Sequence, residues 1–199
     1  MLSPQEPFTI LLFGRSGAGK GTQAKLLKEF LEKRKRHVVK VETGELLREA
    51  AEMDTYGGHL VKFNIDHGRL MPACLPIWSW THKLLTSAKK ESDIILDGFC
   101  RRQEEVLIAE QALQFFERFN IHIVYLNTSK ENCMKRMKAR NRKDDTEQGI
   151  MTRLEWFDWH TLPALSLLKD YRNYHFHEID GNGTPEEVFK SMSEALFSE

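Results

Sequence analysis

The chain has 199 residues, a length that favours a single domain with a substantial hydrophobic core. Its 29 basic and 29 acidic residues cancel, which excludes a global electrostatic attraction, so we expect neither nucleic acid nor a membrane as partner. The three cysteines form no C-x-x-C pair, which argues against a disulfide framework or a zinc site, and no segment resembles a membrane span or signal peptide, so we expect a cytoplasmic protein.

The first predicted elements are a strand, a glycine-rich turn and a helix. The apolar run 8–13 predicts a buried strand, and residues 23–31 have helical spacing. Between them, residues 14–22 read G-R-S-G-A-G-K-G-T and fit the P-loop pattern. Glycines let successive N–H groups point at a phosphate, Lys20 supplies a cation, and Thr22 offers a hydroxyl near Mg²⁺. The flanking strand and helix disfavour the alternative of a chance match.

Strands and helices then alternate along the chain. Further strands are expected at 37–41, 93–98, 121–126 and 174–179, and helices at 45–53, 58–67, 73–89, 104–119, 130–140, 144–171 and 185–197. A bend is expected before Pro163 in the longest helix. This alternation predicts an α/β fold with a parallel sheet covered on both faces, in which ligands bind at the carboxyl ends of the strands. The P-loop, Thr43 and Asp97 all lie at such ends.

Two features favour a structural reading. The basic run 33–36 is typical of a solvated helix end, where cations interact favourably with the helix dipole. Trp78 and Trp80 are expected to pack in the protein rather than to stack on nucleotide bases.

Asp97 ends a predicted strand beside the P-loop. A carboxylate there can hold Mg²⁺ next to Thr22, directly or through water. The alternative is that Asp97 caps the turn that follows it.

Arginines are the second anion-binding feature. We single out Arg48, Arg101, Arg136, Arg140, Arg142 and Arg153. Arg136 and Arg140 stand four residues apart on one helix face, where like charges repel and a polyanion would relieve the repulsion. Guanidinium groups match phosphate oxygens, and phosphoryl transfer depends mostly on positioning and charge stabilisation. The alternative is pairing with Asp144, Asp145, Glu147 and Glu155, and both hold if a moving lid exchanges carboxylates for phosphates.

Six motifs, in the same order along the chain, resemble those of the nucleoside monophosphate kinases, most closely the adenylate kinases. They are residues 14–23, 43–48, 68–72, 97–101, 142–145 with Arg153, and 179–181. The resemblance covers about residues 8–197 and implies a P-loop NTPase fold with a five-stranded parallel sheet. It also implies one domain, 1–199, with a core of 1–42, 73–139 and 144–199, a monophosphate-binding part at 43–72 and a minimal lid at 140–143.

The resemblance implies that ATP and AMP give two ADP, in a monomer that uses Mg²⁺ and holds no structural zinc. The implied ATP site is Gly14, Ser16, Gly17, Ala18, Gly19, Lys20, Gly21, Thr22, Arg136 and Gly181. The implied acceptor site is Thr43, Gly44, Arg48, Met71, Gly98, Arg101, Glu105, Arg142 and Arg153. The implied catalytic residues are Lys20, Arg101, Arg140, Arg142 and Arg153, with Thr22 and Asp97 for Mg²⁺.

Three places depart from the family pattern. The lid shrinks to residues 140–142, which predicts poorer exclusion of water and some competing ATP hydrolysis. Cys100 replaces a proline, which predicts a less rigid loop and a partly exposed, oxidisable thiol. Glu105 replaces a glutamine, and an ionised carboxylate only accepts hydrogen bonds, so it suits guanine better than adenine. Thr43 favours adenine, because pyrimidine-specific relatives tend to carry alanine there.

Two alternatives stay open. The first is the same kinase fold with GMP, CMP or UMP as acceptor, for which Glu105 is the discriminating residue. The second is a catalytically weak nucleotide sensor or scaffold, suggested by the reduced lid and Cys100. Arg48 and Arg101 speak against it, because a pure nucleotide binder needs no arginines for an acceptor.

Overall fold

The structure, a computed structural model, describes residues 6–140, 142, 144–171 and 173–197. Its sheet has the order β2-β3-β1-β4-β5, and every neighbouring pair is parallel. The strands are β1 (Thr9–Phe13), β2 (Val38–Glu42), β3 (Asp93–Asp97), β4 (Ile121–Asn127) and β5 (Tyr174–Asp180). The prediction of an α/β fold with a five-stranded parallel sheet is therefore confirmed.

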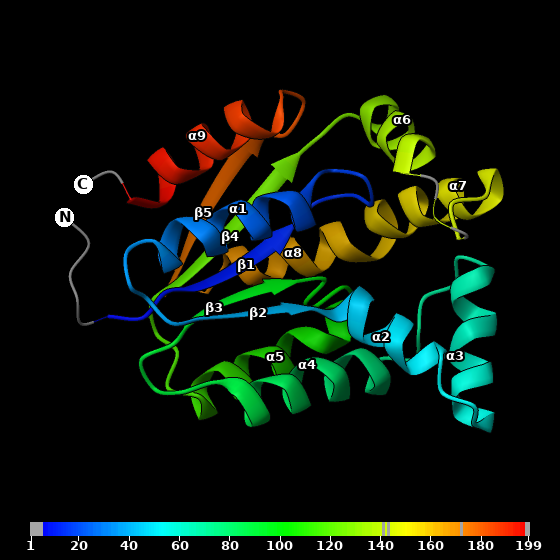
Figure 1. Cartoon of the computed structure of the whole chain (residues 1–199), viewed down its shortest axis with the longest axis horizontal. Coiled ribbons are helices and arrows are strands. Elements are labelled where there is room, and N and C mark those ends of the chain that lie inside the picture. The colour runs from blue at the N-terminus through cyan, green and yellow to red at the C-terminus, as the bar shows by residue number, and fades with distance from the viewer. Residues whose placement is uncertain (1–5, 141, 143, 172, 198–199) are drawn as a thin grey trace.

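Helices cover both faces of this sheet. They are α1 (Lys20–Glu32), α2 (Thr43–Ala51), α3 (Tyr56–Asp66), α4 (Cys74–Ser87), α5 (Gln103–Phe115), α6 (Lys130–Arg140), α7 (Glu147–Trp156), α8 (Leu162–Lys169) and α9 (Pro185–Phe197). Figure 1 shows α1 and α9 on one face and α4 and α5 on the other. Over the described part of the chain, no helix has the length and apolar character needed to cross a bilayer.

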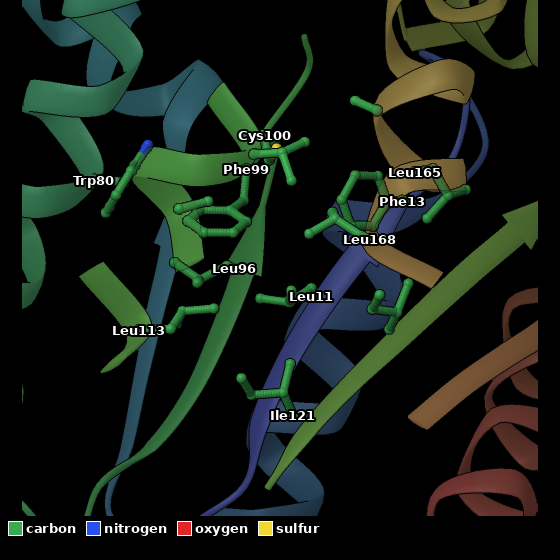
Figure 2. Packing of buried hydrophobic residues seen from close by; sticks show 14 of the residues in the cluster. Leu11, Phe13, Trp80, Leu96, Phe99, Cys100, Leu113, Ile121, Leu165 and Leu168 are labelled. Atoms are coloured by element: carbon green, nitrogen blue, oxygen red, sulfur yellow. The ribbon is translucent and has the colours of Figure 1, made fainter. Parts of the chain in front are cut away.

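The alternation of β1 divides the core into two layers. Leu11 and Phe13 face the side of α4, α5 and α8, where Trp80 is buried, and Figure 2 shows this cluster from close by. Ile10 and Leu12 face the side of α1 and α9. A strand buried on both faces reads as a continuous apolar run, which is why β1 is evident in the sequence.

The predicted packing of the two tryptophans holds for only one of them. Trp80 is buried and makes an edge contact with Phe99, with ring centroids 5.0 Å apart. Trp78 is 57% exposed and stacks on His82, one turn further along α4. The prediction for Trp78 was wrong because it lies on the outer face of the helix.

The prediction of a solvated helix end holds for residues 33–35, which are exposed, but not for Arg36. The Arg36 guanidinium binds the buried Asp93 carboxylate, with Nη2 2.7 Å from Oδ1, and it lies over the Phe8 ring. Arg36 is thus part of the packing at the amino end of β3 and not of a solvated helix end. The pairing joins residues far apart in the sequence, so no local sequence pattern predicts it.

The helix expected over 144–171 is divided in the structure. It begins after Thr146, whose hydroxyl accepts a hydrogen bond from the Gly149 N–H at 3.1 Å. A π-helical turn, η1 (Phe157–Thr161), then separates α7 from α8. This turn immediately precedes α8, which has Pro163 in its first turn, and a proline cannot donate the hydrogen bond that a continuous helix requires. A π-turn therefore interrupts the helix before Pro163, where the sequence predicted a bend.

Residues 43–72 contain a small cluster of their own. Leu47 and Ala51 of α2 pack with Val61 of α3 and with Met71. Figure 1 shows α2 and α3 beyond the carboxyl end of β2, set apart from the layers on the sheet. The remaining domain boundaries, including a lid at 140–143, stay predictions, and residues 141 and 143 lie outside the described residues.

Candidate active site

A cavity of about 920 Å³ opens at the carboxyl ends of the strands. It is lined by every predicted site residue except two: Ser16, Gly17, Ala18, Gly19, Lys20, Gly21, Thr22, Thr43, Gly44, Arg48, Met71, Asp97, Arg101, Glu105, Arg136, Arg140, Arg142, Arg153 and Gly181. Gly14 and Gly98 instead line a smaller space of about 50 Å³, which Lys20, Arg101 and Arg153 also line. Motifs from six parts of the chain therefore converge, and their individual roles stay predictions.

The P-loop backbone depends on its glycines. Gly14, Gly17 and Gly19 all have positive φ, at 149°, 84° and 96°. A Cβ on Gly17 would lie 2.3 Å from the Cys133 carbonyl oxygen of α6, so only glycine fits. Helix α1 starts after Gly19 with no side-chain cap, which leaves its first N–H groups and the positive end of its dipole for an anion.

Lys20 folds back over its own loop. Its Nζ donates hydrogen bonds to the carbonyl oxygens of Gly14 at 2.8 Å and Arg15 at 3.1 Å. Burial lowers the pKa of Lys20, while the negative charge of Asp97 opposes this shift. Burial likewise raises the pKa of Asp97, against the attraction of Lys20 and Arg101. Lys20 and Asp97 therefore interact electrostatically across the cavity, and burial disfavours the charged form of each.

A second carboxylate, Glu42, lies beside Asp97 and was missed in the sequence. The two residues are direct partners in the register of β2 and β3. A Cβ on Gly21 would lie 3.9 Å from Asp97 Oδ2 and 3.8 Å from Glu42 Oε1, so both carboxylates reach the same side of the P-loop. Carboxylate oxygens are the ligands that Mg²⁺ prefers, and Thr22 lines the same cavity. Glu42 Oε1 also lies 2.6 Å from Lys40 Nζ. The described residues contain no cluster of three or more histidine, cysteine or acidic side chains suited to a metal.

Two arginines from different segments converge at Gly44 in the cavity wall. A Cβ on Gly44 would lie 3.5 Å from Arg48 Nη1 and 4.0 Å from Arg101 Nη2. A Cβ on Gly98, which has a φ of 78°, would lie only 2.7 Å from Arg101 Nη2, so this glycine makes room for the guanidinium. Among the described residues, neither guanidinium has a hydrogen bond or ion pair with a protein group. Two unpaired cations facing one cavity favour an anionic ligand.

Arg140, at the end of α6, and Arg153 of α7 have protein partners. Arg140 Nε lies 2.6 Å from Asp145 Oδ2, and Arg153 Nη1 lies 2.6 Å from Asp144 Oδ2. The carboxylate pairing considered from the sequence therefore exists for these two residues. Arg142 also lines the cavity; burial lowers its pKa, and the positive charges of Arg140 and Arg48 lower it further, while Asp144 and Asp145 oppose the shift.

Arg136 has a different environment from Arg140. Its guanidinium donates to the carbonyl oxygens of Gly181 at 2.8 Å, Asn182 at 3.2 Å and Gly183 at 3.0 Å. These bonds tie α6 to the turn after β5, beside the P-loop carbonyl of Ala18 at 3.4 Å. Arg136 therefore shapes this edge of the cavity through the backbone.

The loop that presents Arg101 is ordered by Glu105. Glu105 Oε2 accepts the Arg101 N–H at 2.8 Å, and burial raises the pKa of Glu105. Cys100 is only 2% exposed and burial raises its pKa, so the predicted exposed and oxidisable thiol is wrong. Thr43 is buried, lines the cavity, and its hydroxyl has no protein hydrogen-bond partner within the described residues.

Comparison with known proteins agrees with this geometry. The family model for adenylate kinase matches residues 12–173. Adenylate kinase 1 of Nostoc sp. is 32% identical over 95% of this chain and 98% of its own length. Adenylate kinase of Mycobacterium leprae is 32% identical over 94% and 98%, and UMP-CMP kinase 1 of Oryza sativa subsp. japonica is 31% identical over 98% and 76%. The P-loop, the convergent arginines and these matches together show that the chain belongs to the adenylate kinase family of phosphotransferases.

Proposed function

We propose that this enzyme transfers the γ-phosphoryl group of Mg²⁺-bound ATP to AMP and releases two ADP. The observation that carries the proposal is that one cavity is lined both by the P-loop and by unpaired arginines from other segments. A nucleotide-binding module needs the first set of groups only. Two sets of phosphate-binding groups in one cavity supply the positioning on which phosphoryl transfer depends.

The donor side is the P-loop with Lys20. Loop N–H groups and the free end of α1 bind the ATP phosphates, and the Lys20 ammonium leaves its two backbone carbonyls to contact them. Thr22 and Asp97 would hold Mg²⁺, directly or through water, and a bound ion would supply charge neutralisation at the phosphates. Arg136 and Gly181 border the base of ATP.

The acceptor side is the wall of Arg48 and Arg101. Their guanidinium groups bind the AMP phosphate, and the Thr43 hydroxyl and the backbone at Met71 border its base. Arg140, Arg142 and Arg153 surround the transferring phosphoryl group when the two carboxylates that now hold Arg140 and Arg153 are exchanged for phosphate oxygens. The attacking phosphate is an anion, so the transfer needs no strong general base.

The site also supports proposals about the setting of the reaction. The oxygen donors beside the P-loop favour Mg²⁺ over softer metals, and the balanced charge gives no reason to expect nucleic acid as a partner. We propose that the enzyme works as a monomer in the cytoplasm, and that no structural zinc contributes to its short lid.

The experiment measures ADP formation from Mg²⁺-ATP with AMP, GMP, CMP and UMP in parallel, with one reaction that lacks an acceptor. We expect AMP to give the fastest turnover. Faster turnover with another monophosphate would replace the proposed acceptor but keep the mechanism. ADP formation that needs no acceptor would instead identify a leaky ATPase, and no product anywhere would favour a nucleotide-binding module.

A second acceptor has one specific observation in its favour. Glu105 lines the cavity with a carboxylate where adenine would need a donor, and an ionised carboxylate accepts two hydrogen bonds from guanine. Against it, burial raises the pKa of Glu105, and one carboxylate oxygen already accepts the Arg101 N–H. We therefore keep AMP as the proposed acceptor and GMP, CMP or UMP as the alternatives.

A further inference from the structure

A single π-helical turn contacts both loops that flank the reaction centre. Turn η1 joins α7 to α8 and contains the hydrogen bond from the Leu162 N–H to the Phe157 carbonyl, one residue wider than an α-helical turn. Phe157 and Thr161 of this turn line the small space of about 50 Å³, which the P-loop and Arg101 also line. Such turns often occur at functional sites, which directs attention to the side chains that η1 presents.

One end of this contact is Asp158. Its Oδ1 lies 2.7 Å from Nη2 of Arg15, and the Arg15 guanidinium lies 5.0 Å from the centroid of the Phe157 ring. Asp158 Oδ2 also lies 2.6 Å from Lys130 Nζ. Arg15 belongs to the P-loop, and its carbonyl oxygen accepts a hydrogen bond from Lys20 Nζ. Asp158 therefore holds Arg15, whose carbonyl oxygen is one of the two that bind the Lys20 ammonium.

The other end is Thr161, three residues after Asp158. Its hydroxyl donates a hydrogen bond to the Arg101 carbonyl oxygen at 3.2 Å, and Thr161 is buried. The Arg101 N–H is bound by Glu105, so both backbone polar groups of Arg101 are held. Between the two ends, the Phe157 ring is buried and stacks on Tyr125 of β4. The turn itself is thus anchored in the core.

We propose that Asp158 and Thr161 are positioning residues that hold the P-loop and the Arg101 loop at a fixed separation. The inference rests on the proposed function, in which the P-loop carries the phosphoryl donor and Arg101 carries the acceptor phosphate. Reacting groups must be held within a few tenths of an ångström of the productive geometry, and a displacement of about 1 Å can lower a rate about 10²-fold. The turn acts on neither nucleotide alone but on the distance between them.

The kinetic test uses Asp158→Asn, Thr161→Val and the double variant. We expect each single variant to lower kcat about tenfold, while the dissociation constants of ATP alone and AMP alone change less than about twofold. We expect the kcat of the double variant to lie within about twofold of the kcat of the slower single variant, because breaking either contact already releases the connection. Asp158→Glu should restore most of the rate. Lys130→Met, which keeps the Arg15 contact, should stay within about twofold of wild type.

The proposal would be overturned if the kcat losses of the two single variants multiplied in the double variant. It would also be overturned if kcat did not change, or if the affinity for either nucleotide fell as much as kcat. A second measurement does not depend on activity. Hydrogen exchange should quicken in peptides from both loops, 14–20 and 98–105, in either single variant. Acceleration confined to the loop that each residue touches would refute the connection. If wild type prefers another acceptor, the same variants are compared with that acceptor. If wild type transfers no phosphoryl group, the proposed function fails, and the exchange result alone decides the proposal.

Discussion

Replacing Arg101 is the most direct test of the proposed acceptor site. The Arg101 guanidinium has no protein partner among the described residues, and it lies near Arg48 in the cavity wall at Gly44. Replacement by alanine removes the cation but keeps the backbone bonds to Glu105 and Thr161, because those bonds use only the main chain of Arg101. Arg101→Ala should therefore fold like wild type.

The size of the effect follows from the hydrogen bonds that are lost. A hydrogen bond to a charged group contributes about 1.5–3 kcal/mol. A guanidinium that binds phosphate through two such bonds therefore contributes about 3–6 kcal/mol, which corresponds to a factor of about 10²–10⁴ in kcat/KM. Arg101→Lys keeps the charge and loses the two-pronged geometry, so it should lie between alanine and wild type.

The assay follows ADP formation at saturating Mg²⁺-ATP with AMP varied, and calorimetry measures the dissociation constant of ATP alone. We expect a large loss in kcat/KM for AMP and less than about a twofold change in ATP binding. Arg34→Ala, at an exposed position after α1 where the guanidinium lies over Phe30, is the control for a lost arginine. Unchanged turnover in Arg101→Ala would show that the acceptor site is wrongly assigned. An equal loss of ATP binding would place Arg101 on the donor side instead.

Three further predictions concern other parts of the structure. Glu105→Gln restores a donor and should raise the AMP-to-GMP ratio of kcat/KM by about tenfold or more, and an unchanged ratio would refute base reading by Glu105. Gly17→Ala should weaken ATP binding more than tenfold, because backbone strain and the clash at Cys133 cost about 2 kcal/mol. Gly57→Ala, which has open space around it, should leave ATP binding unchanged, and equal ATP affinity of the two variants would contradict this prediction. Burial, with His177 and His175, lowers the pKa of His122 to about 4, so this histidine should stabilise the fold fully above about pH 6.5 and lose up to about 3 kcal/mol as the pH falls to 4. The free energy of unfolding in urea should therefore fall less with decreasing pH in His122→Phe than in wild type, by up to about 3 kcal/mol at pH 4. The same pH dependence in the two proteins would exclude the effect.

Local patterns were sufficient wherever a residue's role depends on its neighbours in sequence. The apolar run of β1, the spacing of α6 and the glycine pattern of the P-loop each predict their own conformation, because periodicity and positive φ are properties of short segments. The rule that ligands bind at the carboxyl ends of parallel strands then brings the P-loop and Asp97 together without a structure. The arginines were found by their crowding and by the family resemblance.

Features that depend on which segments meet were not predictable in this way. Glu42 is one of several acidic residues in the sequence, and only the register of β2 against β3 places it beside Asp97. Cys100 was expected to be partly exposed, because a loop position carries no signal of burial. The buried pair of Arg36 and Asp93 likewise joins residues that are 57 positions apart.

The sequence by itself determined the order of the elements, the phosphate-binding loop and the set of cations, because each of these is written in short-range residue types. Only the tertiary structure decided which arginines are paired with carboxylates and which face the cavity unpaired. It also decided that one π-turn touches both the P-loop and the Arg101 loop, through Asp158 and Thr161. The physical reason is that charge pairing and close contact depend on distances of a few ångströms between distant segments, and packing of the helices on the sheet sets those distances.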